Sequence, residues 1–120
     1  MAMLFVYGTS LPGQPDHRWI AGLPLAPATV RGSLWRGPRN RPALLAEDGG
    51  RPIRGALLEI EDGRLAVLDL VETAGEGVLV RRMVRASTNL RPVHAHAWVI
   101  DKPPRGWRKL ATDDWAGSHR

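Results

Sequence analysis

Most of the chain consists of short apolar or alternating segments separated by turns rich in glycine and proline. Segments of this kind are typical of buried or half-buried β-strands. The pattern predicts six strands, at residues 3–7, 28–35, 42–46, 53–60, 78–86 and 93–100. We therefore expect most of the backbone to lie in one sheet or barrel.

One segment has the spacing of a helix instead. Leu65, Leu68 and Val71 recur at helical intervals, and Asp62 is placed to cap the first turn. The helix is expected to end near Glu72, because two glycines follow shortly after it. This is the one substantial helix that the pattern predicts.

Six strands and one main helix predict an α+β domain, a small mixed β-barrel that is closed or nearly closed. Residues 16–21 are expected to form one or two helical turns. Gly32 indicates a bulge or a close backbone approach inside its strand. Residues 1–101 are expected to form the barrel domain. Residues 102–120, rich in proline, glycine and charge, are expected to be an extended tail packed on the same domain.

Composition narrows the class of protein. With 120 residues, 43% hydrophobic and 24% charged, the chain has the size and balance of one globular domain. The absence of cysteine excludes a disulfide scaffold, a thiol nucleophile and a thiolate metal site. No apolar run approaches the roughly 20 residues that cross a bilayer, and the start, MAMLFVYG, lacks the features of a signal peptide. We expect a soluble, cytoplasmic protein without a membrane segment.

Charge and aromatic content raise the question of a nucleic-acid partner. The formal net charge is +5, and five tryptophans are spread along the chain. Arginines interleaved with aromatic residues could bind single-stranded nucleic acid. The arginines are scattered, however, and with one Phe and one Tyr available the tryptophans are needed as core or tail anchors. We therefore expect no nucleic-acid partner.

The turn after the first strand is the first candidate site. It reads YGTSLPG at residues 7–13, and Gly8 permits unusual backbone angles there. Successive backbone N–H groups could then point into one concavity and bind a carboxylate or a phosphate. The alternative is that the segment is only a turn.

Glu72 is the second candidate. It follows Leu68 by four residues and so lies on the apolar face of the helix. Burial disfavours the charged form of a carboxyl group, which raises its pKa and makes it a usable general base and then acid near neutral pH. The alternative is a solvated glutamate at a helix end. Asp69 is expected to have a structural role, either capping the loop or pairing with Arg81 or Arg82.

Metal and cofactor sites have little support. His94 and His96 share one strand face, and two imidazoles at that spacing could ligate a metal, but no third ligand is evident near them. The sequence contains no phosphate-binding glycine loop of the nucleotide type and no nucleophile elbow that would support a Ser-His-Asp arrangement. We expect no metal and no cofactor.

Several of these features occur together in one known family. The chain resembles the gamma-glutamylcyclotransferase-like family, also called AIG2-like, in the order YGTSLPGQPDH, VRGSLW with PALL, IRGALLEI, LAVLDLVE and VLVRRMV. The most specific parts are the Tyr-Gly-Thr-x-x-Pro-Gly turn and the Leu-Asp-x-x-Glu helix end. The tail Asp113-Asp114-Trp115 is similar to the Gly-Asp-Trp ending of many members.

The resemblance implies a barrel that binds a small-molecule γ-glutamyl substrate. It implies that Tyr7, Gly8, Thr9 and Ser10 bind the substrate, with the backbone of this turn holding the α-carboxylate, and that Glu72 is catalytic. Glu72 would take a proton from the α-amino group, which attacks the γ-carbonyl of the same molecule. Ring closure would give 5-oxoproline and a free amine, with no metal or cofactor needed.

Two parts of the chain differ from the family pattern. Thr73 and Leu79 stand where members usually have a small residue and a tyrosine, and Ser10-Leu11 replaces the familiar Leu-Lys or Leu-Arg. A second interpretation follows, in which the chain is a catalytically altered or inactive member that acts as a small-molecule-binding or protein-interaction module. The sequence leaves open the identity of the leaving amine and the oligomeric state.

Overall fold

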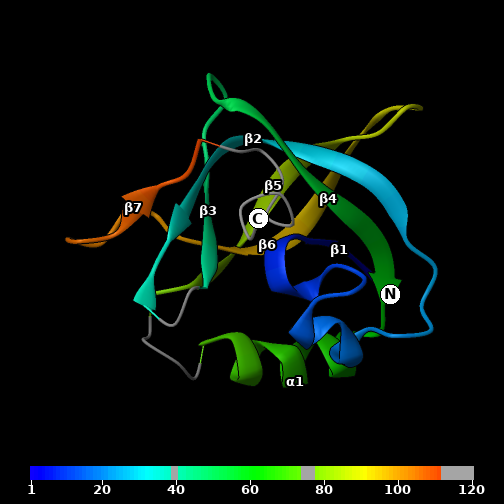
Figure 1. Cartoon of the computed structure of the whole chain (residues 1–120). Coiled ribbons are helices and arrows are strands. Elements are labelled where there is room, and N and C mark those ends of the chain that lie inside the picture. The colour runs from blue at the N-terminus through cyan, green and yellow to red at the C-terminus, as the bar shows by residue number, and fades with distance from the viewer. Residues whose placement is uncertain (39–40, 74–77, 112–120) are drawn as a thin grey trace.

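The computed structural model describes residues 1–38, 41–73 and 78–111. Seven strands lie within these residues: β1 (Ala2–Val6), β2 (Ala26–Arg36), β3 (Pro42–Ala46), β4 (Arg51–Ile60), β5 (Val80–Ser87), β6 (Pro92–Val99) and β7 (Arg108–Lys109). β1, β4, β2, β5 and β6 pair in that order, and β6 pairs with β1 again, so these strands close a barrel (Figure 1). β3 and β7 are additional strands on β2. The expected α+β barrel with one main helix is confirmed.

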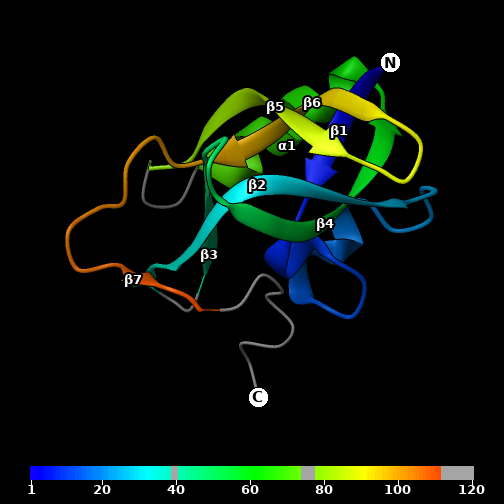
Figure 2. The same ribbon diagram turned by 90° about the horizontal axis from the view of Figure 1, so that it is seen from above.

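The barrel is mixed because its closure is parallel. β1 pairs with β6 in parallel at Leu4 and His96, whereas its pairing with β4 is antiparallel. β3 also joins β6 in parallel, at Leu44 and Val99. In Figure 2, β2 and β4 lie on one side of the barrel and β5 and β6 on the other.

Buried apolar side chains form two clusters on opposite faces of the barrel wall. The inner cluster is supplied by the strands: Phe5, Ala28, Val30, Leu34, Leu44, Ile53, Leu57, Val84, Ala86, Ala95, Ala97 and Val99. The outer cluster lies between the wall and the helix: Leu4, Val6, Ile20, Ala56, Leu58, Ile60, Leu65, Leu68 and Trp98. β1 contributes to both clusters, which explains why its sequence is an unbroken apolar run rather than an alternating one.

The helix α1 (Asp62–Thr73) lies below the barrel in Figure 1 and buries Leu65 and Leu68 against it. The helix begins one residue earlier than predicted. Asp62 is already helical, and the amide of Leu65 donates to the carbonyl of Glu61 at 2.9 Å, so Glu61 and not Asp62 precedes the first turn. Asp62 still lies in the first turn, where a negative charge interacts favourably with the helix dipole.

Two local expectations have clear outcomes. Gly32 lies so close to the backbone of Leu45 on β3 that a Cβ atom would collide with its carbonyl, as a close approach requires. The tail contains an unpredicted strand, since β7 pairs with the end of β2 and the amide of Leu110 donates to the carbonyl of Leu34 at 2.8 Å. Residues 112–120, which include the Asp113-Asp114-Trp115 motif, lie outside the described residues.

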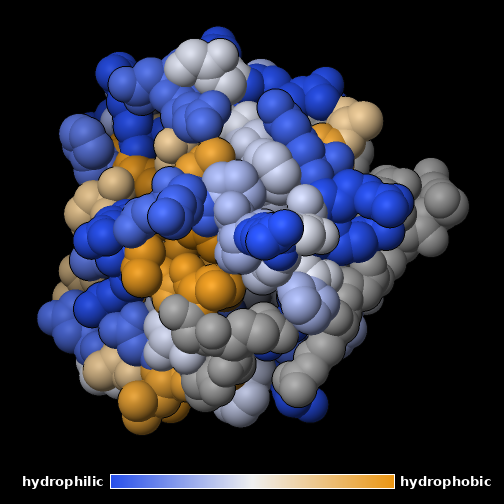
Figure 3. Space-filling view, turned by 90° about the vertical axis from the view of Figure 1, so that its left-hand side faces the viewer, coloured by the Kyte–Doolittle hydropathy of each residue, from blue (hydrophilic) through white to orange (hydrophobic). Residues whose placement is uncertain are grey.

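The outer surface is mainly hydrophilic on the side of β3 and β7, with a hydrophobic patch near the centre of the view and smaller hydrophobic areas around it (Figure 3). The large apolar side chains that are exposed come from separate parts of the chain: Met1, Val67, Leu70, Met83 and Leu90. In the described part of the chain, no helix has the length and apolar character needed to cross a membrane.

Candidate active site

The last turn of α1 brings Glu72 to the barrel. Glu72 lies four residues after the buried Leu68, so the apolar face of the helix also carries its carboxyl group. The side chain is half-buried and borders a small cavity. The structure thus agrees with the predicted position on the buried face and not with a fully solvated glutamate.

The turn after β1 faces the same cavity. It forms a short 3-10 helix, η1 (Gly8–Ser10), in which Gly8 has a φ of +62°. Gly8 is buried against Pro42, and a Cβ atom on it would collide with the proline ring. This close approach sets the position of Thr9 and Ser10, which both line the cavity.

The backbone of the turn differs in one respect from the predicted anion nest. The amide of Ser10 donates to the carbonyl of Tyr7 at 3.3 Å, and the amide of Leu11 donates to the carbonyl of Gly8 at 3.2 Å. Within the described residues, the amides of Gly8 and Thr9 make no hydrogen bond. Two backbone N–H groups therefore stay available for a carboxylate, and the Ser10 amide does not.

Residues from several elements of the fold line the cavity. Its volume is about 30 Å³, and its wall is formed by Phe5, Val6, Tyr7, Thr9, Ser10, Pro42, Glu72, Leu79 and Trp98. A volume of this size holds roughly one or two waters, so a larger molecule needs the side chains around it to move apart. Tyr7, Thr9, Ser10 and Glu72 are brought together as predicted, and Leu79 forms part of the apolar wall.

The pKa of the Glu72 carboxyl is raised above its ordinary value. Burial is the main cause, and the nearby carboxylate of Asp16 adds to it, whereas the guanidinium of Arg41 acts in the opposite direction. A carboxyl with a raised pKa exchanges protons closer to neutral pH, as general acid–base chemistry needs.

Asp16 and Arg41 form a charged group beside the turn that the sequence did not reveal. Asp16, on the 3-10 helix η2 (Pro15–Trp19), accepts a hydrogen bond from Thr9 Oγ1 at 2.6 Å and lies 3.5 Å from the guanidinium of Arg41. His17 Nδ1 donates to the carbonyl of Ser10 at 3.0 Å. The helical turns predicted at residues 16–21 thus correspond to η2, which holds the turn from outside.

Removing the charge of Arg41 and removing the charge of Asp16 are expected to shift the pKa of Glu72 in opposite directions. Arg41→Met should raise it further, because the favourable cation is lost, and Asp16→Asn should lower it, because the repelling carboxylate is lost. A carboxyl ¹³C NMR titration measures both. Arg31→Met and Asp48→Asn make the same charge changes elsewhere and should leave the titration unchanged; equal shifts in these controls would contradict the local effect.

Tyr7 ties three strands together next to the site. Its hydroxyl donates to the carbonyl of Trp98 on β6 at 2.6 Å and accepts from the amide of Leu44 on β3 at 2.9 Å. Burial raises the pKa of the hydroxyl, and the nearby Glu72 carboxylate raises it further. Tyr7 is therefore neutral, and its hydroxyl is already engaged on both sides.

Tyr7→Phe is expected to destabilise the fold. It leaves the fully buried amide of Leu44 without its acceptor, which costs about 1–3 kcal/mol in the free energy of unfolding. Denaturant unfolding with an unchanged m-value would measure this cost. An unaltered midpoint would show that the hydroxyl is not the link between β3 and β6.

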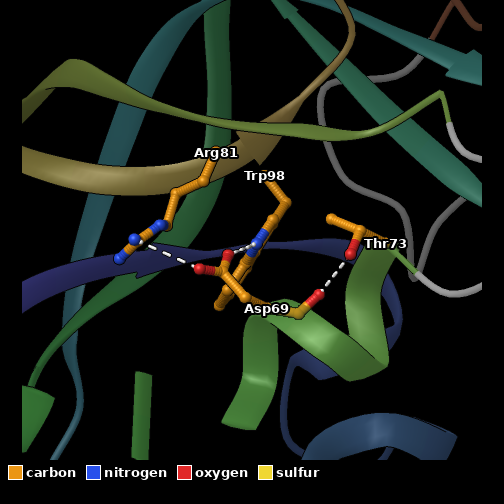
Figure 4. A network of polar contacts seen from close by, with 4 residues as sticks. All are labelled: Asp69, Thr73, Arg81 and Trp98. Carbon is orange, nitrogen blue, oxygen red and sulfur yellow. Dashed lines mark hydrogen bonds and ion pairs between the residues drawn. The ribbon is translucent and has the colours of Figure 1, made fainter. Parts of the chain in front are cut away.

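A polar network joins the last turns of α1 to the barrel wall (Figure 4). Asp69 Oδ1 accepts from Trp98 Nε1 at 2.7 Å, and Asp69 Oδ2 lies 3.1 Å from the guanidinium of Arg81 on β5. The expected pairing of Asp69 is thus with Arg81. Arg82 pairs instead with Asp101, at 2.8 Å.

Other candidate features lie apart from this cavity. His94 is exposed and His96 half-buried on β6, and the described residues contain no group of three or more His, Cys, Asp or Glu side chains able to hold a metal. Two larger hollows, of about 900 and 450 Å³, contain none of the predicted site residues. We place the candidate site at the small cavity because the titratable groups with burial-shifted pKa values, Tyr7 and Glu72, meet there.

Comparison with known proteins identifies a family. Residues 4–117 match the family described as gamma-glutamyl cyclotransferase, AIG2-like. A Drosophila melanogaster protein named as a putative gamma-glutamylcyclotransferase is 36% identical over 81 residues. The matched region is 59% of this chain and 52% of that protein, so the chain spans about half the length of the curated relative it matches.

Solved structures share the fold. YkqA from Bacillus subtilis matches with a TM-score of 0.77 and 21% identity over 98% of this chain and 40% of its own. The uncharacterized protein PH0828 from Pyrococcus horikoshii matches with a TM-score of 0.72 and 19% identity, over 99% of this chain and 93% of its own. A mouse AIG2-like protein matches with a TM-score of 0.70 and 24% identity, over 87% and 80%.

Proposed function

Because the chain belongs to the gamma-glutamyl cyclotransferase, AIG2-like family, we propose that it releases 5-oxoproline and a free amine from a γ-glutamyl amine or amide. The observation that carries the proposal is the position of Glu72. This half-buried carboxyl, with its raised pKa, borders the same cavity as Thr9 and Ser10. A proton carrier and a turn with free backbone N–H groups thus face one space.

The proposed reaction is an intramolecular acyl transfer. The carboxylate of Glu72 takes a proton from the substrate's α-ammonium group, and the resulting amine attacks the γ-carbonyl carbon to form the new C–N bond of a five-membered ring. Glu72 gives its proton to the leaving nitrogen as the bond from that carbon to this nitrogen breaks, and the released amine takes up the second proton, which the ring nitrogen loses, so that it departs as an ammonium ion. Substrate atoms are conserved in the two products, and the carboxylate of Glu72 is regenerated.

Tethering supplies much of the rate in this scheme. The nucleophile and the carbonyl belong to one molecule, so the enzyme has only to fold the substrate into a near-attack geometry. The free amides of Gly8 and Thr9 are suited to the substrate's α-carboxylate, and Ser10 offers a hydroxyl at the cavity wall. The hydroxyl of Thr9 is less available to the substrate, because it already donates to Asp16.

The test is a substrate panel. The purified protein is incubated with γ-glutamyl amines, γ-glutamyl amino acids and γ-glutamyl peptides, and 5-oxoproline is detected by mass spectrometry. Product from one class identifies the leaving amine. If no panel member is turned over while a γ-glutamyl ligand raises the melting temperature, the chain is a binding module of the same fold, and the cyclotransferase proposal fails.

A further inference from the structure

The end of α1 is held to the barrel mainly by polar contacts. The buried apolar side chains of the helix are Leu65 and Leu68, and none lies beyond Leu68 in the described helix. Leu70 is 72% exposed, and Val71 is half-buried. Helix ends without apolar anchorage are prone to fray. The turn that carries Glu72 therefore needs another attachment.

Asp69 provides this attachment, with both carboxylate oxygens engaged on the barrel. Oδ1 accepts the indole N–H of Trp98 on β6, and Oδ2 faces the guanidinium of Arg81 on β5 (Figure 4). Both partners come from neighbouring strands that pair in register at Arg81 and Trp98. A bond to a charged acceptor is roughly twice as strong as a neutral one, so this is a firm link between helix and wall.

The link lies one turn away from Glu72 and at the same cavity. Asp69 and Glu72 are three residues apart, about 4.5 Å along the helix axis. Trp98, which Asp69 holds, lines the cavity with Glu72, and its carbonyl also accepts the hydroxyl of Tyr7. Thr73 Oγ1 donates to the carbonyl of Asp69 at 2.5 Å, which ties the residue after Glu72 to the same point.

We propose that Asp69 is a positioning residue, which fixes the last turn of α1 against Trp98 and Arg81 and so keeps the carboxyl of Glu72 at the cavity. The expected effect of Asp69 on turnover rests on the proposed function, whereas its expected effect on the placement of Glu72 is independent of that function. A displacement of about 1 Å in a catalytic group costs on the order of 100-fold in rate. Asp69→Ala is therefore expected to lower kcat by about that factor, with a much smaller change in KM.

A second readout separates positioning from simple stability. When the last turn is released, the carboxyl of Glu72 meets more water, so its pKa should fall toward the ordinary value in Asp69→Ala. A ¹³C NMR titration of the folded variant measures this, with Glu72→Gln used to assign the signal. Arg41 and Asp16 also face Glu72, and both are left in place. A merely structural residue would lower the melting temperature without moving this titration.

The chain offers a closely matched control. Asp101 pairs with Arg82, the neighbour of Arg81 on β5, and both partners are exposed. Asp101→Ala should leave both kcat and the titration of Glu72 unchanged. Asp69→Asn, which keeps an oxygen for the indole N–H but loses the charge facing Arg81, should be intermediate, and it serves if the alanine variant fails to fold.

The outcomes distinguish the two proposals. A folded Asp69→Ala variant with the kcat and the Glu72 titration of the wild type would overturn the positioning role. If the wild type forms no 5-oxoproline but the Glu72 pKa still falls in Asp69→Ala, the positioning role stands and the proposed function is wrong. Loss of kcat to the same extent in Asp101→Ala would attribute the effect to general loss of charge and would also overturn the proposal.

Discussion

Glu72→Gln is expected to abolish the formation of 5-oxoproline while the protein remains folded. General acid–base catalysis by one positioned group contributes about 10²–10⁴-fold, and glutamine can neither take nor return the proton. In the wild type, kcat/KM should fall as the pH drops through the raised pKa of Glu72, because the base is then protonated. Mass spectrometry of 5-oxoproline across pH measures both effects.

The matched control lies at the other end of the same helix. Glu61 is exposed and supplies its backbone carbonyl to α1, so Glu61→Gln should retain full turnover. Turnover by Glu72→Gln at the wild-type rate would remove Glu72 from its role. A loss of turnover in both variants would point to net charge instead of a specific base.

Glu72→Gln should also change the thermal stability of the protein, and the direction of the change follows from the raised pKa. The folded state raises the pKa of Glu72, so its contribution to stability is fully present below the ordinary pKa and is lost as the pH rises through the folded-state pKa. Glutamine has no such step. The melting temperature of Glu72→Gln relative to wild type should therefore rise with pH over this window, as thermal unfolding at several pH values would show.

Gly8→Ala is expected to damage the turn more than any other glycine substitution near it. The left-handed φ of +62° costs an alanine about 1–2 kcal/mol, and the collision with Pro42 adds about 1–3 kcal/mol for overpacking. Because Pro42 and Thr9 line the cavity, turnover should fall as well. Urea unfolding and the 5-oxoproline assay measure the two effects.

Gly13→Ala isolates the backbone part of that cost. Gly13 also has a positive φ, of +84°, but nothing lies within 4 Å of the position where a Cβ atom would be. It should show the backbone penalty alone and keep turnover. Equal destabilisation of Gly8→Ala and Gly13→Ala would show that the contact with Pro42 contributes nothing.

The sequence pattern predicted the strands whose formation depends on residues close together in the chain. The strand at residues 42–46 was predicted with its exact limits, since an apolar run follows a proline and precedes charged and glycine residues. β7 was missed because it consists of two cations, Arg108 and Lys109, whose pairing depends only on the free edge of β2. No hydrophobic period marks such a strand.

At the candidate site, too, local spacing predicted some features, whereas others depend on tertiary contacts. The helical spacing from Leu68 predicted which face carries Glu72, and the strand–turn sequence predicted the position of Gly8. The sequence did not reveal Arg41, because its partner Asp16 lies on a distant segment and neither residue sits in a pattern of its own. The contact between Asp69 and Trp98 likewise joins separate elements, so only the tertiary structure brings them together.

The parallel closure of the barrel sets the order in which the site can be assembled. β1 pairs with β4 and β6, and the hydroxyl of Tyr7 bonds to the carbonyl of Trp98, a partner 91 residues away. During synthesis the first strand therefore leaves the ribosome long before its last neighbour exists. Contacts of such long range form late and slow folding. The turn that faces Glu72 gains its support from β6 only after nearly the whole barrel has been made.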